Sequence, residues 1–263
     1  CSLSLLPFQA MLQIFPDPVA IAEHVSNVLV EKIRSKPEVV LGLATGGTME
    51  PIYASFVGKA HQYRVDVSRV TSFNLDEYVG LDPHHPKSYA AYMREHLFRH
   101  LNFDESRLHI PNGLAQDLHQ HSREYSARLS QAGGVDLQLL GVGSNGHIGF
   151  NEPGTPFDST CHVVQLSERT RLDNSRFFEG NAIVPGSAIT MGMTEIMRAR
   201  EIVLVATGEA KAKIVAEWYR KEVTEAVPFT ILKRHPRARV ILDEAAASLL
   251  PEHLQRALLA IPA

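Results

Sequence analysis

The sequence Val39-Val40-Leu41-Gly42-Leu43-Ala44-Thr45-Gly46-Gly47-Thr48 decides the fold. Its first six residues form an almost continuous apolar run, which is typical of a parallel strand buried on both faces. The run leads directly into two glycines flanked by threonines. Ile52, Tyr53 and Phe56 then follow at helical spacing. This stretch therefore predicts a buried strand, a tight turn and a helix.

The same rhythm recurs along the chain. Further strands are predicted at Val70–Leu75, Leu137–Val142, Ile202–Ala206 and Val240–Leu242, with a first strand opening at Met11. Helices are predicted from Asp17-Pro18, over Ser88–Leu101 and Asp117–Gln131, and after Thr207-Gly208 through Trp218. Strands that alternate with helices favour an α/β fold with a mostly parallel open sheet and helices on both faces. We expect a single domain over residues 11–263, and we interpret residues 1–10 as a non-native or disordered extension.

Composition restricts the classes of partner. The 263 residues carry a formal net charge of -3 without a block of like charges, which disfavours nucleic acid and anionic membrane surfaces. The apolar runs are far shorter than the ~20 residues of a membrane span. Two cysteines cannot form a disulfide framework and favour a reducing, cytoplasmic location. We therefore expect a small-molecule partner.

Four predicted strands end in polar or glycine-rich sequence. These ends are Thr45-Gly46-Gly47-Thr48, Asp76-Glu77, Gly143-Ser144-Asn145-Gly146-His147 and Thr207-Gly208-Glu209-Ala210-Lys211. Because ligands of open parallel sheets bind beyond the carboxyl ends of the strands, the four segments are expected to form one site.

Each of these segments can also be explained by a purely structural role. Gly46-Gly47 fits either a tight turn or an anion site at a helix N-terminus. Asp76 fits a helix N-cap, and His147 fits a buried core histidine, although Glu152 five residues later could fix its tautomer. Lys211 fits a solvated lysine or a partner of a bound anion.

Other motifs in the sequence are less informative. Arg176 fits either a phosphate ligand or a surface arginine stacked on Phe177. The remaining histidines lack the spacing of a metal site. The polar stretch from Pro153 to about Pro185 has no clean period and is typical of a lid or binding loop.

Three long motifs together resemble the glucosamine-6-phosphate deaminase family. They are Phe73-Asn74-Leu75-Asp76-Glu77-Tyr78-Val79-Gly80, Gly143-x-x-Gly146-His147-Ile148-Gly149-Phe150-Asn151-Glu152-Pro153 and Asn174-Ser175-Arg176-Phe177-Phe178. The resemblance extends from about Leu41 to Asp243. It implies a modified Rossmann-like fold, no cofactor, no metal and a sugar-phosphate substrate.

The resemblance also implies roles for individual residues. Asp76 would move a proton between C-2 and C-1, while His147, oriented by Asn145 and Glu152, would open the sugar ring. Glu77, Gly143 and Gly146 would complete the site. The 6-phosphate would be held by Thr45, Gly46, Gly47, Thr48, Arg176 and Lys211. Hydrolytic deamination of glucosamine 6-phosphate would then give fructose 6-phosphate and ammonia.

Two departures from the family pattern matter. One branch of the family has aspartate at the position of Asn145, and the neutral amide here should lower the basicity of His147. The segment Thr160–Val164 lacks the basic residues of the allosteric hexameric branch, so we expect no activation by N-acetylglucosamine 6-phosphate and a monomer or small homo-oligomer. Alternatives are a 6-phosphogluconolactonase, which lacks the Asn-Glu-Pro continuation, and a non-catalytic sugar-phosphate sensor, which would not need Asp76 or His147.

Overall fold

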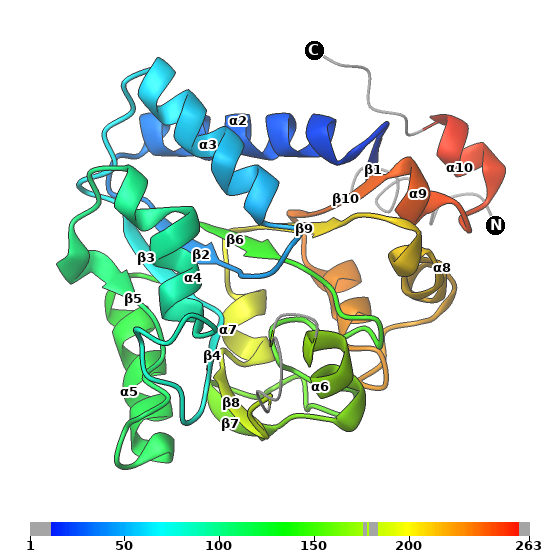
Figure 1. Ribbon diagram of the computed structural model, residues 1–263. Helices are drawn as coiled ribbons and strands as arrows, with labels where there is room; N and C mark the ends of the chain where they lie inside the picture. The colour runs from blue at the N-terminus through cyan, green and yellow to red at the C-terminus, as the bar shows by residue number, and fades with distance from the viewer. Residues whose placement is uncertain (1–11, 176–177, 179–183, 258–263) are drawn as a thin grey trace.

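The computed structural model describes residues 12–175, 178 and 184–257. Its centre is a seven-stranded sheet in the order β1-β10-β9-β6-β2-β3-β5, and every neighbouring pair is parallel (Figure 1). The strands are β1 (Leu12–Phe15), β2 (Val40–Leu43), β3 (Thr71–Asn74), β5 (Leu108–His109), β6 (Leu137–Leu140), β9 (Glu201–Ala206) and β10 (Ala238–Asp243). The predicted α/β fold with a mostly parallel sheet is confirmed. Residues 1–10 lie outside the described residues.

Helices cover both faces of this sheet. They are α2 (Pro18–Ser35), α3 (Glu50–Gln62), α4 (Tyr89–His96), α5 (Leu118–Gln131), α7 (Met193–Met197), α8 (Ala212–Arg220), α9 (Glu244–Ala247) and α10 (Glu252–Ala257). Figure 1 shows α2 and α3 side by side along one face, with α7 on the opposite side. The predicted cap at Asp17 is present, because its Oδ1 accepts a hydrogen bond from the N–H of Ala20 at 2.8 Å.

The packing of Tyr125 shows how the helix α5 contributes to the hydrophobic core. Tyr125 of α5 is buried and meets the Phe73 ring of β3 edge to face, with ring centroids 5.7 Å apart. Its hydroxyl donates to the carbonyl of Asn74 at 2.7 Å, so the polar end of the ring is satisfied inside the core.

Within the described residues, no helix has the length and apolar character needed to cross a bilayer.

A second, three-stranded antiparallel sheet was not predicted. It pairs β4 (Asp76–Tyr78) with β8 (Ser187–Thr190), and β8 with β7 (His162–Gln165). These strands have three or four residues and are far apart in sequence, so neither periodicity nor a hairpin turn announces them. The segment from Pro153 to Pro185 is therefore not wholly irregular, since it contains β7 and the helix α6 (Glu168–Ser175).

One predicted helix was too long. The helix expected over residues 88–101 ends at His96, and a short 3-10 helix follows over Phe98–His100. Ser88 is the N-cap of α4, and its side chain accepts a hydrogen bond from the N–H of Ala91 at 3.0 Å. Leu97 leaves the helical conformation at φ -139° and ψ -63°, which separates the two pieces.

The strand order determines where a ligand can bind. From β2 the chain builds β3 and β5 on one side, and β6, β9 and β10 on the other. The switch point therefore lies between β2 and β6, and open α/β sheets bind their ligands at such a point, beyond the carboxyl ends of the strands. The four strands with unusual ends are the adjacent strands β9-β6-β2-β3, so the predicted convergence of these ends is confirmed.

Candidate active site

The loop after β6 brings His147 back toward the strand that precedes it. The N–H of Gly146 donates to the carbonyl of Gly143 at 3.0 Å, and the N–H of Gly143 donates to the carbonyl of His147 at 2.9 Å. Gly146 has φ +87°, which favours glycine. A Cβ at Gly143 would lie 2.1 Å from Cε1 of His147, so the imidazole rests directly on this glycine. Both glycines are therefore needed for the ring to take this position.

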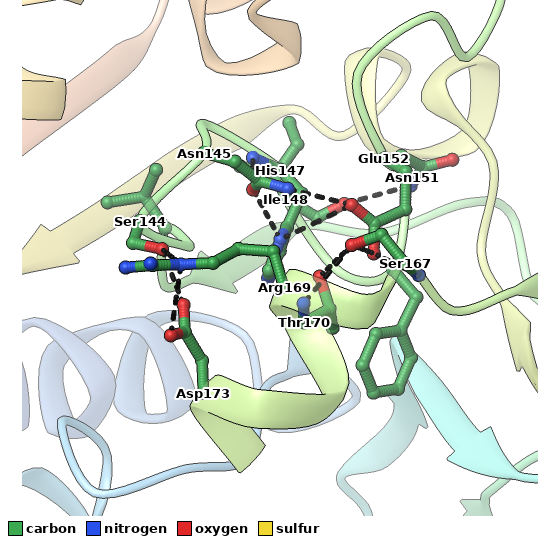
Figure 2. Close-up of polar contacts among 12 residues, drawn as sticks. Ser144, Asn145, His147, Ile148, Asn151, Glu152, Ser167, Arg169, Thr170 and Asp173 are labelled. Atoms are coloured by element: carbon green, nitrogen blue, oxygen red, sulfur yellow. Dashed lines mark hydrogen bonds and ion pairs between the residues drawn. The ribbon is translucent and has the colours of Figure 1, made fainter. Parts of the chain in front are cut away.

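Asn145 lies between His147 and Glu152, as Figure 2 shows. Its Nδ2 donates to Oε2 of Glu152 at 2.8 Å, and its Oδ1 is 2.7 Å from Nδ1 of His147. Because the carboxylate can only accept, it fixes the orientation of the amide and turns Oδ1 toward the ring. The proton of the neutral imidazole then sits on Nδ1, and Nε2 is left as the basic nitrogen.

Glu152 is itself held by the chain around it. The buried Asn151 donates from Nδ2 to the carbonyls of Ile148 and Met191, at 2.9 and 2.8 Å, which fixes the turn that carries Glu152. On its other oxygen, Oε1, Glu152 accepts from the hydroxyl of Ser167 at 3.2 Å. Sequence reasoning missed Ser167, since nothing local connects it to Glu152.

Burial governs the protonation of His147. Its side chain is 16% exposed and that of Glu152 is 12% exposed, with Nδ1 4.0 Å from Oε2. Desolvation lowers the pKa of His147, the carboxylate of Glu152 opposes this effect, and the cation of Lys211 adds to it. The ring is thus held neutral at neutral pH, in the form that can accept a proton.

Asp76 is a buried carboxyl group at the start of β4. It is only 6% exposed, and no described residue donates a hydrogen bond to its carboxylate. Burial, followed by the neighbouring charge of Glu77, raises the pKa of Asp76 to about 8. A Cβ at Gly149 would lie 3.6 Å from Oδ2 of Asp76, so this carboxyl group adjoins the loop that carries His147.

Glu77, unlike Asp76, is hydrogen-bonded to backbone N–H groups. Its carboxylate accepts from the backbone N–H groups of Tyr78, Tyr89 and Ala90 at 2.8, 3.0 and 2.9 Å, which places it at the N-terminus of α4. The sequence suggested a helix cap as the alternative for Asp76, but in the structure Ser88 is the N-cap of α4, and Glu77 accepts from the N–H groups of its first two residues. Burial raises the pKa of Glu77 despite the three N–H donors. Its role in the active site stays a prediction.

The described residues predicted to hold a phosphate follow the carboxyl ends of β2 and β9. Gly46 has φ +105°, and no acceptor among the described residues takes the N–H groups of Gly47 and Thr48, which precede α3. Thr45 lies two residues beyond the end of β2, near the side chain of Tyr89 in α4. Exposed N–H groups before a helix are suited to an anion.

Lys211, at the N-cap of α8, donates from Nζ to the carbonyl of Val142 at 2.7 Å. This contact brings its cation to the end of β6. Arg176 lies outside the described residues, although Nδ2 of Asn174 in the same motif donates to the hydroxyl of Tyr78 at 2.9 Å. Among the described residues, no group of three or more His, Cys, Asp or Glu side chains is arranged to hold a metal ion.

Comparisons with known proteins identify the family of this chain. A model of the family described as glucosamine-6-phosphate isomerases/6-phosphogluconolactonase matches residues 18–242. The glucosamine-6-phosphate deaminase of Rhodopirellula baltica is 51% identical over 91% of this chain and 95% of its own length. The deaminase of Shouchella clausii is 49% identical over 87% of this chain and 92% of its own.

Solved structures separate the closer from the more distant likeness. A monomeric glucosamine-6-phosphate deaminase superposes with a TM-score of 0.89 at 39% identity, covering 90% of this chain and 99% of the other. A 6-phosphogluconolactonase from Leishmania guyanensis reaches a TM-score of 0.72 at 20% identity, over 92% and 98% of the two chains, and shares the fold. The chain therefore belongs to the glucosamine-6-phosphate deaminase family, as its three motifs predicted.

Proposed function

We propose that this protein isomerises glucosamine 6-phosphate and hydrolytically deaminates it to fructose 6-phosphate and ammonia. The observation that carries the proposal is the buried carboxyl group of Asp76, with a pKa raised to about 8, beside the loop of His147. The membership of the chain in the deaminase family supports the choice of substrate.

Asp76 suits the proton transfer between C-2 and C-1. Isomerisation of an aminoaldose needs one group that removes the C-2 proton and returns it to C-1, and a base with a pKa near the working pH does this most efficiently. The protonated amine of the substrate would lie close to this carboxyl group. Its positive charge favours the ionised form, so binding of the substrate would itself prepare the base.

His147 suits the opening of the sugar ring, which moves a proton from the C-1 hydroxyl to the ring oxygen. The contact from Nδ1 to Asn145 leaves Nε2 free to accept this proton, and the lowered pKa keeps the ring neutral beforehand. The developing imidazolium would be stabilised by Glu152, whose Oε2 lies 4.0 Å from Nδ1. The glycines at 143 and 146 allow the loop to hold this geometry.

We assign the 6-phosphate to the loop over residues 45–48, with Lys211 and Arg176 as its cations. The open N–H groups of Gly47 and Thr48 before α3 support this assignment. We further propose that the enzyme is cytoplasmic, is a monomer or small homo-oligomer and is not activated by N-acetylglucosamine 6-phosphate. The solved deaminase at 39% identity is described as monomeric, which agrees with this proposal.

The test measures both products from glucosamine 6-phosphate, using the wild-type protein, Asp76→Asn and Glu168→Gln. Glu168 is an exposed carboxylate on α6 and is the matched control. We expect equimolar ammonia and fructose 6-phosphate from the wild type and the control, and none from Asp76→Asn although it binds the sugar phosphate. A folded wild-type protein that binds the substrate without releasing ammonia would refute the proposal.

A further inference from the structure

The helix α6 is attached to the loop of His147 through a side chain that none of the roles above uses. Ser144, which precedes Asn145, donates a hydrogen bond from Oγ to Oδ2 of Asp173 in α6 (Figure 2). Arg169, one turn earlier in α6, places Nε 3.2 Å from Oδ1 of Asp173 and 3.3 Å from Oγ of Ser144. The hydroxyl of Ser144 thus donates to one member of an ion pair and accepts from the other.

This arrangement restrains the loop at Ser144. The other hydrogen bonds of the loop are internal, such as the bond from Gly146 to Gly143, lead through Asn145 to Glu152, or join the carbonyl of Gly146 to the N–H of Phe229. The contact from Ser144 to Asp173 is a direct side-chain tie between α6 and the segment that holds the imidazole. A hydrogen bond to an ionised acceptor is stronger than one between neutral groups, so this tie depends on the charge of Asp173.

The charge itself also matters at His147. Asn145 touches Nδ1 but is neutral, so it offers no charge to an imidazolium. The carboxylates of Glu152 and Asp173 also interact electrostatically with the ring. Both raise the pKa of His147, against the larger effect of burial, which lowers it. The cation of Lys211 at the end of β6 lowers it. Arg169 partly offsets Asp173 through their ion pair.

We propose that Asp173 is a positioning residue for His147: through Ser144 it holds the histidine loop against α6, and its carboxylate supplies negative charge that the neutral Asn145 lacks. The ion pair with Arg169 sets the strength of this effect. The electrostatic part is independent of the reaction, whereas the kinetic consequence rests on the function proposed above.

The test is an NMR titration of His147 in protein with isotope-labelled histidine, with the resonance assigned by its loss in His147→Gln. Asp173→Asn should lower the measured pKa of His147. Arg169→Gln should raise it, because Asp173 then loses its compensating cation. Glu168→Gln, the same chemical change on an exposed residue of the same helix, should leave it unchanged. Asp173→Glu should return the pKa toward the wild-type value.

Enzyme kinetics provide a second test of the proposal. With glucosamine 6-phosphate, Asp173→Asn should reduce kcat about tenfold, which corresponds to the lower end of the contribution of one hydrogen bond to a charged group. Ser144→Ala should reduce kcat to a similar extent and shift the pKa of His147 less than Asp173→Asn does. If Asp173→Asn behaves like Glu168→Gln, or if Asp173→Asn and Arg169→Gln shift the pKa in the same direction, the proposal is wrong. Opposite shifts in a protein that releases no ammonia would instead refute the deaminase function and leave the electrostatic role intact.

Discussion

Replacement of Asp76 by asparagine should stabilise the folded protein at neutral pH while it abolishes turnover. The carboxyl group is buried and receives no hydrogen bond from the described residues, so its ionised form is strongly disfavoured in the fold. In the unfolded chain the same group ionises freely. Folding at neutral pH therefore has to neutralise or bury this charge, and the neutral amide removes that cost.

The magnitude follows from the two pKa values. The folded pKa of Asp76 is raised to about 8 from an ordinary value of 3.8. Between these values the unfolded chain has lost the proton and the folded chain still holds it, so the free energy of unfolding falls as the pH rises, by about 1.4 kcal/mol per pH unit. Between pH 4 and pH 7 this amounts to about 4 kcal/mol as an upper limit. Burying an unpartnered amide costs about 1–3 kcal/mol in return.

The assay is urea unfolding of the wild-type protein and Asp76→Asn at several pH values from 4 to 8. We expect the variant to be equal or less stable near pH 4 and more stable by about 1–3 kcal/mol at pH 7. Glu168→Gln, at an exposed position, should show no such pH-dependent difference. A difference between Asp76→Asn and the wild type that stays constant over this range would refute the assignment of a raised pKa to Asp76.

Three further substitutions test the geometry of the site. Gly143→Ala would place a Cβ 2.1 Å from the ring of His147, so kcat should fall about 100-fold in a protein whose circular dichroism spectrum is unchanged; retained activity would contradict the described ring position. Asn145→Asp would replace the donor that lies 2.8 Å from Oε2 of Glu152 by a second carboxylate. The pKa of His147 measured by NMR should therefore rise and the melting temperature of the protein should fall, whereas a lowered pKa would contradict the contact. Glu77→Gln would turn an amide donor toward the N–H groups at the start of α4, which should reduce stability by about 1–3 kcal/mol in urea unfolding; an unchanged stability would show that this cap is dispensable.

The parallel sheet, and the candidate site at its carboxyl edge, could be predicted from the sequence because both predictions depend on local patterns. The continuous apolar run of β2 and the glycines after it indicate a buried strand and a turn without any knowledge of distant residues. The carboxyl ends of β9, β6, β2 and β3 share one edge as a consequence of parallel order, so their polar ends could be joined into one site beforehand. The pairing of His147 with Glu152 could also be predicted, since Glu152 follows only five positions later.

Contacts between distant segments were decided by the tertiary structure alone. The antiparallel sheet unites Asp76 with Thr190, and no local pattern announces such a pairing between short strands. This sheet also separates the two acidic neighbours, leaving Asp76 beside the histidine loop and Glu77 on α4. Burial likewise raises the pKa of Asp76, and the tie from Asp173 to Ser144 depends on where α6 packs. A sequence specifies which groups are available through its local patterns, but desolvation and long-range hydrogen bonds arise only once the folded chain brings those groups together.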